Sequence, residues 1–302
     1  MRPQKSRKIA FWNKPEKAAY FFIAPSLLIL TVFVFIPLIL ALALGFTKID
    51  LFLKGVRFAG FDNFVNAFTD GRVWNAFKNT FYFTLMATPL QVFFGLLIAC
   101  MVAGAKRFDK LMRSIYFIPA VCSMTVVGIM CSLVLDPNIG MVPYYIFKLG
   151  FDKPMMLKDP SLAMPTIVLI TVWKNFGYMM IILVAGISGI SNTYYEASEI
   201  DGASRIQQFF AVTIPLLLPS LSFCLVTNLI SSFQVFDQVY VTTNGGPMYR
   251  TETVVQYIYS RGFSGEYNLG YASSIAFMLF AVIVLFTLLL NRWLRAREEK
   301  IY

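Results

Sequence analysis

The segment YYEASEIDGASRIQQFFAVTIP, from Tyr194 to Pro215, separates two long apolar runs in a chain that is otherwise apolar and basic. It carries three carboxylates and, at Gly202, a single glycine. A short acidic segment of this kind is either a solvated loop or a folded element with a partner. The choice depends on what the flanking apolar runs are.

The composition is typical of a membrane protein. Of the 302 residues, 58% are apolar and 14% are charged, and the mean hydropathy is +0.66, whereas soluble chains carry about a quarter charged residues. The apolar residues form runs of the roughly 20 residues that a helix needs to cross the hydrocarbon core. The first run is too long for a signal-peptide core of roughly 7 to 15 residues, and we expect it to remain as a span. The six predicted spans are Ala18–Phe46, Thr80–Ala103, Ser114–Leu135, Ala163–Ile190, Pro219–Thr243 and Tyr271–Asn291. The sequence therefore predicts an all-α polytopic protein with six transmembrane helices.

The basic residues predict the orientation of these spans. Three basic clusters fall on one side if six helices alternate: Arg2, Lys5, Arg7, Lys8, Lys14 and Lys17; Lys106, Arg107, Lys110 and Arg113; and Arg292, Arg295, Arg297 and Lys300. That side is predicted to be cytoplasmic, with both chain ends inside. We expect a cytoplasmic arm at 1–17, a membrane domain at 18–292 and a cytoplasmic tail at 293–302. The net charge of +10 follows from this topology, and a nucleic-acid site is disfavoured because the basic residues form no separate domain.

Several kinds of chemistry are excluded by residue type. The chain has no histidine, and its cysteines lie inside predicted spans without metal-ligand spacing. These are Cys100, Cys122, Cys131 and Cys224. No glycine-rich phosphate loop followed by Lys and Ser or Thr occurs. We therefore expect no metal site, no bound cofactor and no ATP hydrolysis by this chain itself.

The opening segment has the signals of two short helices. Thr193 followed three residues later by Glu196 matches a capping box and predicts a helix start. Gly202 is predicted to end that helix in the left-handed conformation. The stretch RIQQFFAVTIP then resumes helical periodicity, and Pro215 is expected to end it. The segment is predicted to form a helix-turn-helix against the membrane face.

The same segment resembles a known family motif. Its pattern consists of Glu196-Ala197, Asp201-Gly202-Ala203, Phe210, Ile214-Pro215-Leu216 and Pro219. It is similar to the EAA loop of permease subunits in binding-protein-dependent ABC importers, where the loop docks as a coupling helix into a groove of the ATPase subunit. Ser198 replaces an alanine that is common there, and we expect docking to survive because serine is nearly as small. The resemblance implies an ATPase-coupling loop at 191–215 with the residues Tyr195, Glu196, Ala197, Ser198, Asp201, Gly202, Ala203 and Pro215.

The resemblance extends over nearly the whole chain. The stretches FDNFVNAF (61–68), AFKNT (76–80), TNGGP (243–247) and LGYASSIAFML (269–279) look like the sugar-type branch of these permeases. It implies the type I ABC importer permease architecture, a carbohydrate cargo and a location in the bacterial cytoplasmic (inner) membrane. The partners it implies are a second permease subunit in a heterodimer, two ATP-binding subunits that use ATP and Mg, and an extracellular or periplasmic solute-binding protein. That binding protein is expected to meet the outer turn NGGPMYR (244–250).

Two predicted spans gather polar residues on one arc. In the fifth span, at about 100° per residue, these are Thr227, Asn228, Ser231, Ser232, Gln234, Gln238 and Thr242. In the fourth span they are Thr171, Lys174, Asn175 and Tyr178, continued by the small residues Ala185 and Gly189. Such arcs must face protein or water, because unsatisfied polar groups in hydrocarbon cost several kcal/mol each.

Amides and hydroxyls beside an aromatic ring suit an uncharged, hydroxyl-rich solute such as a carbohydrate, although small and polar residues also serve as helix–helix contacts. The candidate substrate-binding residues are Tyr178, Asn175, Lys174, Asn228, Ser231, Ser232, Gln234 and Asp237. The resemblance matches sugar contacts to Tyr178, Asn228 and Ser232 among them.

Lys174 and Asp237 are charged residues within predicted spans, where they could pair or extend to the outer interface. A secondary active transporter for a small polar solute is an alternative, and it would be expected to carry inverted repeats or interrupted helices. An intramembrane enzyme using Glu199 and Asp201 is disfavoured, because they lie in a loop without an apolar pocket. The sequence favours the permease subunit of an ATP-driven carbohydrate importer.

Overall fold

The computed structural model describes residues 15–50, 56–104 and 107–299. This part of the chain is predominantly helical. Its helices are α1 (Pro15–Leu30), the π-helical η2 (Thr31–Phe35), α2 (Ile36–Gly45), α3 (Asp62–Thr69), α4 (Gly71–Val102), α5 (Arg107–Val121), α6 (Met124–Val134), α7 (Met141–Lys148), α8 (Ala163–Ser188), α9 (Asn192–Ile200), α10 (Arg205–Gln208), the π-helical η3 (Phe209–Thr213), α11 (Ile214–Phe233), α12 (Asp237–Thr242), α13 (Val254–Tyr259), the π-helical η4 (Ser260–Ser264) and α14 (Leu269–Glu298). Strands β1 (Thr47–Lys48) and β2 (Arg57–Phe58) pair antiparallel. The predicted arm before Pro15, together with Lys106 and Lys300, lies outside the described residues.

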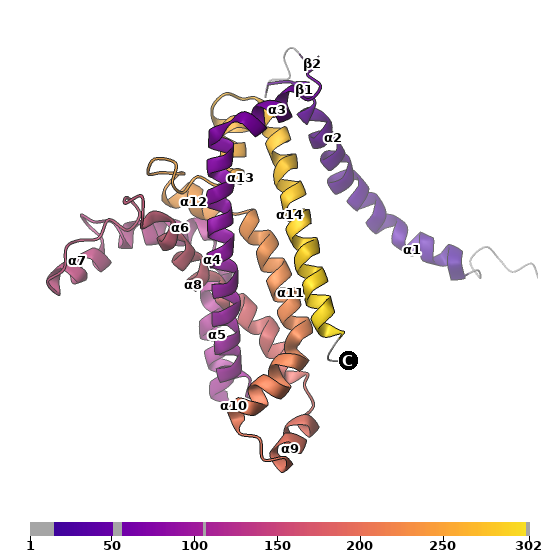
Figure 1. Cartoon of the computed structure of the whole chain (residues 1–302), viewed down its shortest axis with the longest axis vertical. Coiled ribbons are helices and arrows are strands. Elements are labelled where there is room, and N and C mark those ends of the chain that lie inside the picture. The colour runs from indigo at the N-terminus through magenta and orange to yellow at the C-terminus, as the bar shows by residue number, and fades with distance from the viewer. Residues whose placement is uncertain (1–14, 51–55, 105–106, 300–302) are drawn as a thin grey trace, which may run out of the picture.

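Five described helices are long and apolar enough to cross a membrane (Figure 1). They are Tyr20–Gly45, Gly71–Val102, Ala163–Ser188, Arg205–Phe233 and Leu269–Glu298. The pair α5 and α6 gives a sixth span if it is counted as one, although the two helices meet at a 90° bend.

The third predicted span, Ser114–Leu135, is therefore wrong as a continuous helix. It breaks at Ser123, whose backbone is extended (φ −60°, ψ 136°). Pro119 lies in the last turn of α5, where its ring and missing N–H weaken the helix. Hydropathy cannot reveal such a break, because both halves are apolar.

The fifth predicted span, Pro219–Thr243, is wrong at both ends. The helix begins at Arg205 and ends at Phe233, and α12 is a separate helix. The break after Phe233 is held from elsewhere in the chain: Val235 is 2% exposed, and its carbonyl accepts a hydrogen bond of 2.9 Å from the Thr253 hydroxyl. A contact between distant segments thus ends a helix that the local sequence would continue.

Two further boundaries differ from the prediction. The second span begins at Gly71, nine residues before the predicted Thr80, and the last helix continues to Glu298. Much of the predicted 293–302 tail is therefore the end of α14.

The core forms where α4 packs on α8 and α11. A Cβ added to Gly95 of α4 would lie 2.6 Å from the Cβ of Met179, and one added to Gly177 of α8 would lie 2.2 Å from the carbonyl oxygen of Tyr116. Glycine is needed at both crossings because the backbones approach so closely. Buried apolar side chains fill the interface around them, among them Val92, Ala99, Met180, Leu183, Leu217 and Leu221.

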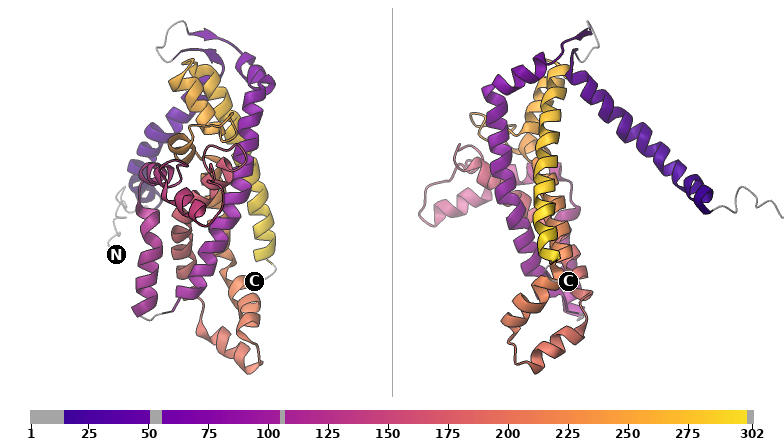
Figure 2. Two further views of the ribbon diagram at one scale, coloured as in Figure 1. Left: turned by 90° about the vertical axis from the view of Figure 1, so that its left-hand side faces the viewer. Right: turned by 45° about the vertical axis from the view of Figure 1, so that its right-hand side comes forward.

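The first span stands away from this bundle (Figure 2). None of its most apolar 18-residue window is buried within the chain. Its end is fixed by Asn63, whose Nδ2 donates to the carbonyls of Gly45 (2.9 Å) and Thr47 (2.8 Å). The rest presents apolar side chains to lipid or to another protein.

The molecule has two distinct ends. Helices α9 and α10 lie at one end, and the β1–β2 sheet and α3 lie at the other (Figure 1). The C-terminal end of α4, the start of α5 and the C-terminal end of α14 lie toward the α9 end (Figure 2).

Candidate functional site

The segment singled out by the sequence forms two short helices at one end of the bundle. Helix α9 is capped by Ser191, whose Oγ accepts the Thr193 amide hydrogen at 3.4 Å. The predicted capping box between Thr193 and Glu196 is wrong, since Thr193 lies within the first turn. Serine is at least as good an N-cap as threonine, so the helix starts two residues earlier than predicted.

Gly202 makes the turn between the two helices. Its φ is +76°, so the predicted left-handed conformation is confirmed. The Gly202 amide donates to Glu199 O at 3.0 Å, and the Ala203 amide donates to Ser198 O at 2.9 Å. These two bonds are the Schellman pattern, which satisfies carbonyls at a helix C-terminus.

A capping box does occur, at the start of α10. Ser204 Oγ accepts the Gln207 amide hydrogen (3.4 Å), and Gln207 Oε1 accepts the Ser204 amide hydrogen (2.8 Å). The helix then continues through η3 into α11, so the predicted end at Pro215 is wrong. The π-helical turn directly before Pro215 shifts the hydrogen-bond pattern, and the helix passes the proline as a local distortion.

Residues 191–213, which we call the end hairpin, combine anchoring and exposed groups. The Tyr195 hydroxyl lies 3.0 Å from Thr213 Oγ1, which ties α9 to the base of α11. Three apolar side chains face outward: Ile200 is 87% exposed, Ile206 72% and Phe210 66%. Exposed apolar side chains among polar ones are typical of a protein-binding surface.

The predicted coupling residues divide by exposure. Glu196, Ala197, Asp201 and Gly202 are exposed, and Tyr195, Ser198, Ala203 and Pro215 are half-buried. The Ser198 hydroxyl donates to the carbonyl of Tyr195 at 2.7 Å, so it faces its own helix.

The predicted substrate residues are not all brought together. Asn228 and Ser232 are buried, Lys174 and Asn175 are half-buried, and Tyr178, Ser231, Gln234 and Asp237 are exposed. Because α11 ends at Phe233, neither Gln234 nor Asp237 shares its helical arc. Among the described residues, Lys174 and Asp237 form no ion pair.

Lys174 instead contacts the broken third span. Its Nζ donates to the carbonyl of Ala120 (3.2 Å) and to Asn175 Oδ1 (3.4 Å). Ala120 lies in the last turn of α5, where carbonyls lack helical partners and a cation is favoured. Lys174 thus donates a hydrogen bond to a backbone carbonyl at the end of α5, where the predicted third span breaks.

Sequence analysis missed a polar face on α4. Thr84, Thr88 and Gln91 are 4%, 5% and 2% exposed, and Thr88 Oγ1 donates to Ser232 Oγ at 3.2 Å. Their spacing of four and three residues places them on one helical face. That spacing within an apolar run was a detectable signal.

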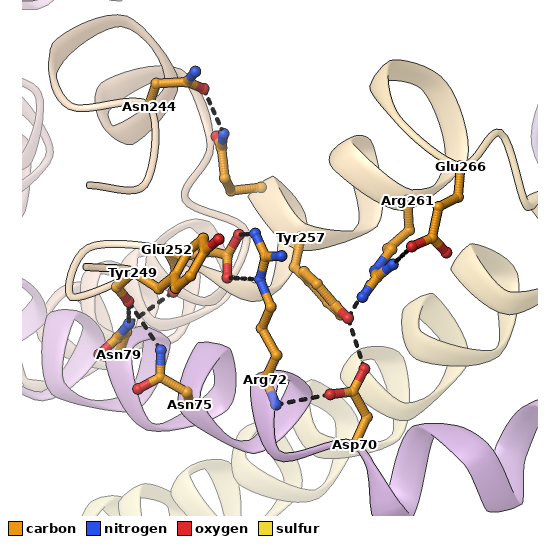
Figure 3. A network of polar contacts seen from close by, with 11 residues as sticks. Asp70, Arg72, Asn75, Asn79, Asn244, Tyr249, Glu252, Tyr257, Arg261 and Glu266 are labelled. Atoms are coloured by element: carbon orange, nitrogen blue, oxygen red, sulfur yellow. Dashed lines mark hydrogen bonds and ion pairs between the residues drawn. The ribbon is translucent and has the colours of Figure 1, made fainter. Parts of the chain in front are cut away.

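A second polar region lies around the start of α4, at the opposite end from the hairpin (Figure 1), and Figure 3 shows its contacts. Arg72 donates to Glu252 through Nε (2.8 Å) and Nη2 (2.7 Å), and the Glu252 side chain is 4% exposed. Asn79 donates to the carbonyls of Tyr249 (2.8 Å) and Glu252 (2.9 Å), and Asn75 to that of Tyr249 (2.9 Å). These contacts hold the loop between α12 and α13 on α4.

Asp70 is the centre of a neighbouring cluster. Its Oδ2 accepts the hydroxyls of Tyr257 (2.6 Å) and Tyr271 (2.8 Å), and Arg261 Nε lies 2.7 Å from the Tyr257 hydroxyl. Burial opposes ionisation of Asp70, but these hydrogen bonds and one from the Arg72 amide outweigh it, so the pKa of the carboxyl is lowered. Burial, followed by the hydrogen bond to Asp70, raises the pKa of Tyr257 to about 12.

An open cavity of 580 Å³ lies beside Asp70. Its polar lining consists of Lys48, Asp50, Asn63, Asn66, Asp70, Arg261, Glu266, Asn268 and Tyr271. The cavity could not be predicted from the sequence, because its lining residues come from segments that are far apart along the chain. The predicted turn at 244–250 is present nearby, with hydrogen bonds from the Gly246 amide to Thr243 O and from the Arg250 amide to Pro247 O, each 2.9 Å.

Two curated relatives cover nearly the whole chain. The probable ABC transporter permease protein YesP of Bacillus subtilis (strain 168) is 35% identical over 292 residues, which are 95% of this chain and 92% of the relative. The lactose transport system permease protein LacF of Rhizobium radiobacter is 30% identical over 287 residues, covering 93% of this chain and 94% of the relative.

The fold also matches a solved structure. A bacterial alginate ABC transporter, in complex with an alginate pentasaccharide-bound periplasmic protein, contains a chain that superposes with a TM-score of 0.82. The two chains are 23% identical, and the match covers 95% of this chain and 98% of that one. The predicted importer permease architecture is thereby confirmed.

The family assignment follows from a match to residues 67–300, which include the end hairpin, the polar face of α4 and the Asp70 cluster. The matching family is described as "Binding-protein-dependent transport system inner membrane component". Together with the relatives above, this match shows that the chain belongs to that family, the multi-pass membrane permease subunits of ABC transporters.

Proposed function

We propose that this permease carries a carbohydrate across the bacterial cytoplasmic membrane as the non-catalytic subunit of an ATP-driven importer. The observation that carries the proposal is a continuous helical path. The end hairpin continues directly into the Arg205–Phe233 helix, and Asn228 and Ser232 lie near the far end of that helix. A movement imposed on the hairpin is thus conveyed to a polar site within the membrane.

The end hairpin provides the surface for a partner ATPase. Its exposed apolar side chains, Ile200, Ile206 and Phe210, lie beside the exposed carboxylates Glu196 and Asp201. Apolar contacts supply binding energy, and the carboxylates orient a partner that carries basic residues. Two such ATP-binding subunits hold ATP and Mg, and this chain supplies the docking surface.

The cargo proposal is based on the residues of α11 and on a relative. Asn228, Ser231 and Ser232 are uncharged donors and acceptors, which suit sugar hydroxyls. LacF is named as a lactose transport permease. Exposed polar residues of α11, such as Ser231, cannot face lipid without loss of hydrogen bonds, so they line a passage shared with a second permease subunit.

The remaining partners follow from the two ends of the molecule. The exposed α1–α2 helix offers a large apolar surface to a second, different permease subunit and to lipid. We place the end hairpin and both termini in the cytoplasm, because basic residues gather at that end. The opposite end, with the α12–α13 loop, then faces the solute-binding protein.

In the proposed cycle, a sugar-loaded binding protein docks at the outer end and ATP closes the two ATP-binding subunits. The closure moves the end hairpin, and the Arg205–Phe233 helix shifts Asn228 and Ser232. The site then opens to the other side of the membrane, as alternating access requires.

The test is site-specific cross-linking from the end hairpin. A photo-reactive residue in place of Ile206 should form an adduct with the ATP-binding subunit in the assembled complex. The same residue in place of Leu149, which is 76% exposed and lies after α7, should not. A complex that assembles and hydrolyses ATP without any adduct from Ile206 would show that the hairpin is not the docking surface.

The secondary active transporter that the sequence left as an alternative does not fit the family, whose members are permease subunits of ABC transporters. The bent α5–α6 pair resembles the interrupted spans of secondary transporters, but a bent span alone does not identify that class.

A further inference from the structure

A chain of hydrogen bonds crosses from α4 to α11. Thr88 Oγ1 donates to Ser232 Oγ at 3.2 Å, and Ser232 Oγ donates to Asn228 Oδ1 at 3.3 Å. All three side chains are buried, and so is Thr84, one turn before Thr88 on the same face of α4. We call Thr84, Thr88, Asn228 and Ser232 the polar seam.

The polar seam is short of hydrogen-bond partners in this conformation. Asn228 Nδ2 and Thr84 Oγ1 are buried and have no partner among the described residues. A buried donor without an acceptor carries the full cost of its lost hydration. A conformation in which α4 and α11 separate would remove that cost, because water or a solute could then supply the missing partners.

The seam lies between two regions of apolar packing. Toward the hairpin end, α4 and α11 are joined by the apolar contacts of Val92, Leu221 and Cys224. On the other side, Phe83 and Ala87 of α4 belong to the same buried cluster as Val235, which follows the end of α11 at Phe233. The polar seam is thus the part of this interface without apolar packing, and a separation of the helices there leaves both apolar regions in place.

We propose that the polar seam is the closed form of a carbohydrate site, in which Thr84 and Thr88 form the wall opposite Asn228 and Ser232. When the helices separate, hydroxyls of a sugar ring replace the bonds that the seam residues make to one another. The seam contains no charge, so the part of the cargo that it binds is uncharged. This inference rests on the proposed transport function and adds α4 to the residues that contact the cargo.

The first test measures access to the seam. In a complex whose native cysteines are replaced, Thr88→Cys is treated with a small polar methanethiosulfonate reagent, with and without a non-hydrolysable ATP analogue and the binding protein. Before the shift, the open state is the minor state, and such a state is often populated at a few per cent or less. A shift toward the open state should therefore raise the labelling rate of Thr88→Cys by at least about tenfold. Thr287→Cys on α14 is the matched control, since the Thr287 hydroxyl is also buried without a partner but lies outside the seam. Equal labelling of Thr88→Cys in all states, while exposed Ser231→Cys reacts throughout, would overturn the inference.

The second test begins with a panel of mono-, di- and trisaccharides, from which the sugars that stimulate ATP hydrolysis by the wild-type complex are selected. Uptake of each selected sugar is then measured. Thr88→Val keeps the side-chain shape but removes the hydroxyl, and uptake should fall about 3- to 10-fold, the worth of one hydrogen bond. Thr88→Ser should retain uptake, and Thr287→Val should behave as wild type. Normal uptake by Thr88→Val would refute the seam as a cargo site. A wild-type complex that responds to no sugar would instead refute the proposed carbohydrate function, and the labelling test would still decide whether the seam opens.

Discussion

Gly202 offers the sharpest test of the hairpin's role, because its environment isolates one physical effect. A Cβ added there would meet no atom of this chain within 4 Å. The position is nevertheless restrictive, since its φ of +76° is one that L-residues rarely adopt. Gly202→Val therefore strains the backbone, and Gly202→Asn controls for the added side chain on the proposed docking surface.

The size of the effect can be worked out in two ways. A valine held in the left-handed conformation costs roughly 1–2 kcal/mol. If the chain relaxes instead, it loses the hydrogen bonds from the amides of Gly202 and Ala203, each worth about 0.5–1.5 kcal/mol. Both routes are consistent with a cost of about 1–2 kcal/mol, which reduces the population of the native turn by about 5- to 30-fold. Helix α9 has no buried residue, so little other packing offsets this cost.

The assay is sugar-stimulated ATP hydrolysis by the purified complex in lipid, normalised to the amount of assembled complex. Gly202→Val should lose stimulation by about 5- to 30-fold. Gly202→Asn should retain most of it, since asparagine tolerates the left-handed conformation. Gly150→Val is the matched control: Gly150 has φ +91°, open space around it and the same Schellman bonds after α7. Normal stimulation in Gly202→Val with full assembly would show that the turn geometry does not transmit the motion.

Three further predictions concern stability. Gly95→Leu should lower the thermal stability of the purified complex by about 1–3 kcal/mol, because a Cβ at this position would lie 2.6 Å from the Cβ of Met179. Gly71→Ala should lose far less stability, since a Cβ added to Gly71 has no atom within 4 Å. Equal losses in the two variants would contradict the close packing of the helices at Gly95. Glu252→Gln should lower the free energy of unfolding, measured with a chemical denaturant, by ~2 kcal/mol. The loss is smaller than for a fully buried ion pair, because the Arg72 side chain is 32% exposed. An unchanged denaturation midpoint would mean that this ion pair does not hold the α12–α13 loop on α4. The pKa of Asp70 is below its ordinary value of 3.8, so the stability that the carboxylate contributes is present above that pH and is lost as the pH falls through the lowered pKa. Melting curves from about pH 5 down to about pH 2 should show this loss below pH 3.8 in the wild type and a smaller one in Asp70→Asn. Parallel curves would refute it.

Much of the membrane architecture was predictable because hydropathy depends only on local composition. Five predicted runs correspond to continuous helices of spanning length. The left-handed turn at Gly202 was also predictable, since a glycine after a helical stretch is itself the signal. The helix start was misplaced because Ser191 and Thr193 are both good caps, and only the fold decides between them.

The rest depended on contacts between distant segments. The end of α11 at Phe233 is fixed by Thr253, and the polar contacts at the start of α4 join Arg72 to Glu252, 180 residues later. The prediction grouped Gln234 and Asp237 with Asn228 because it assumed one straight helix. The spacing of the polar face on α4 is visible in the sequence, but its contact with Ser232, 144 residues after Thr88, depends on the fold.

The length of the Arg205–Phe233 helix has a mechanical consequence. Between Arg205 and Asn228 there are 23 residue steps, so at 1.5 Å per residue the two ends of this stretch lie ~35 Å apart. A tilt of only about 5° at the hairpin would displace Asn228 by ~3 Å, close to a whole hydrogen-bond length. The geometry thus acts as an amplifier: a small rotation at the hairpin end of the helix suffices to break or make a hydrogen bond at Asn228.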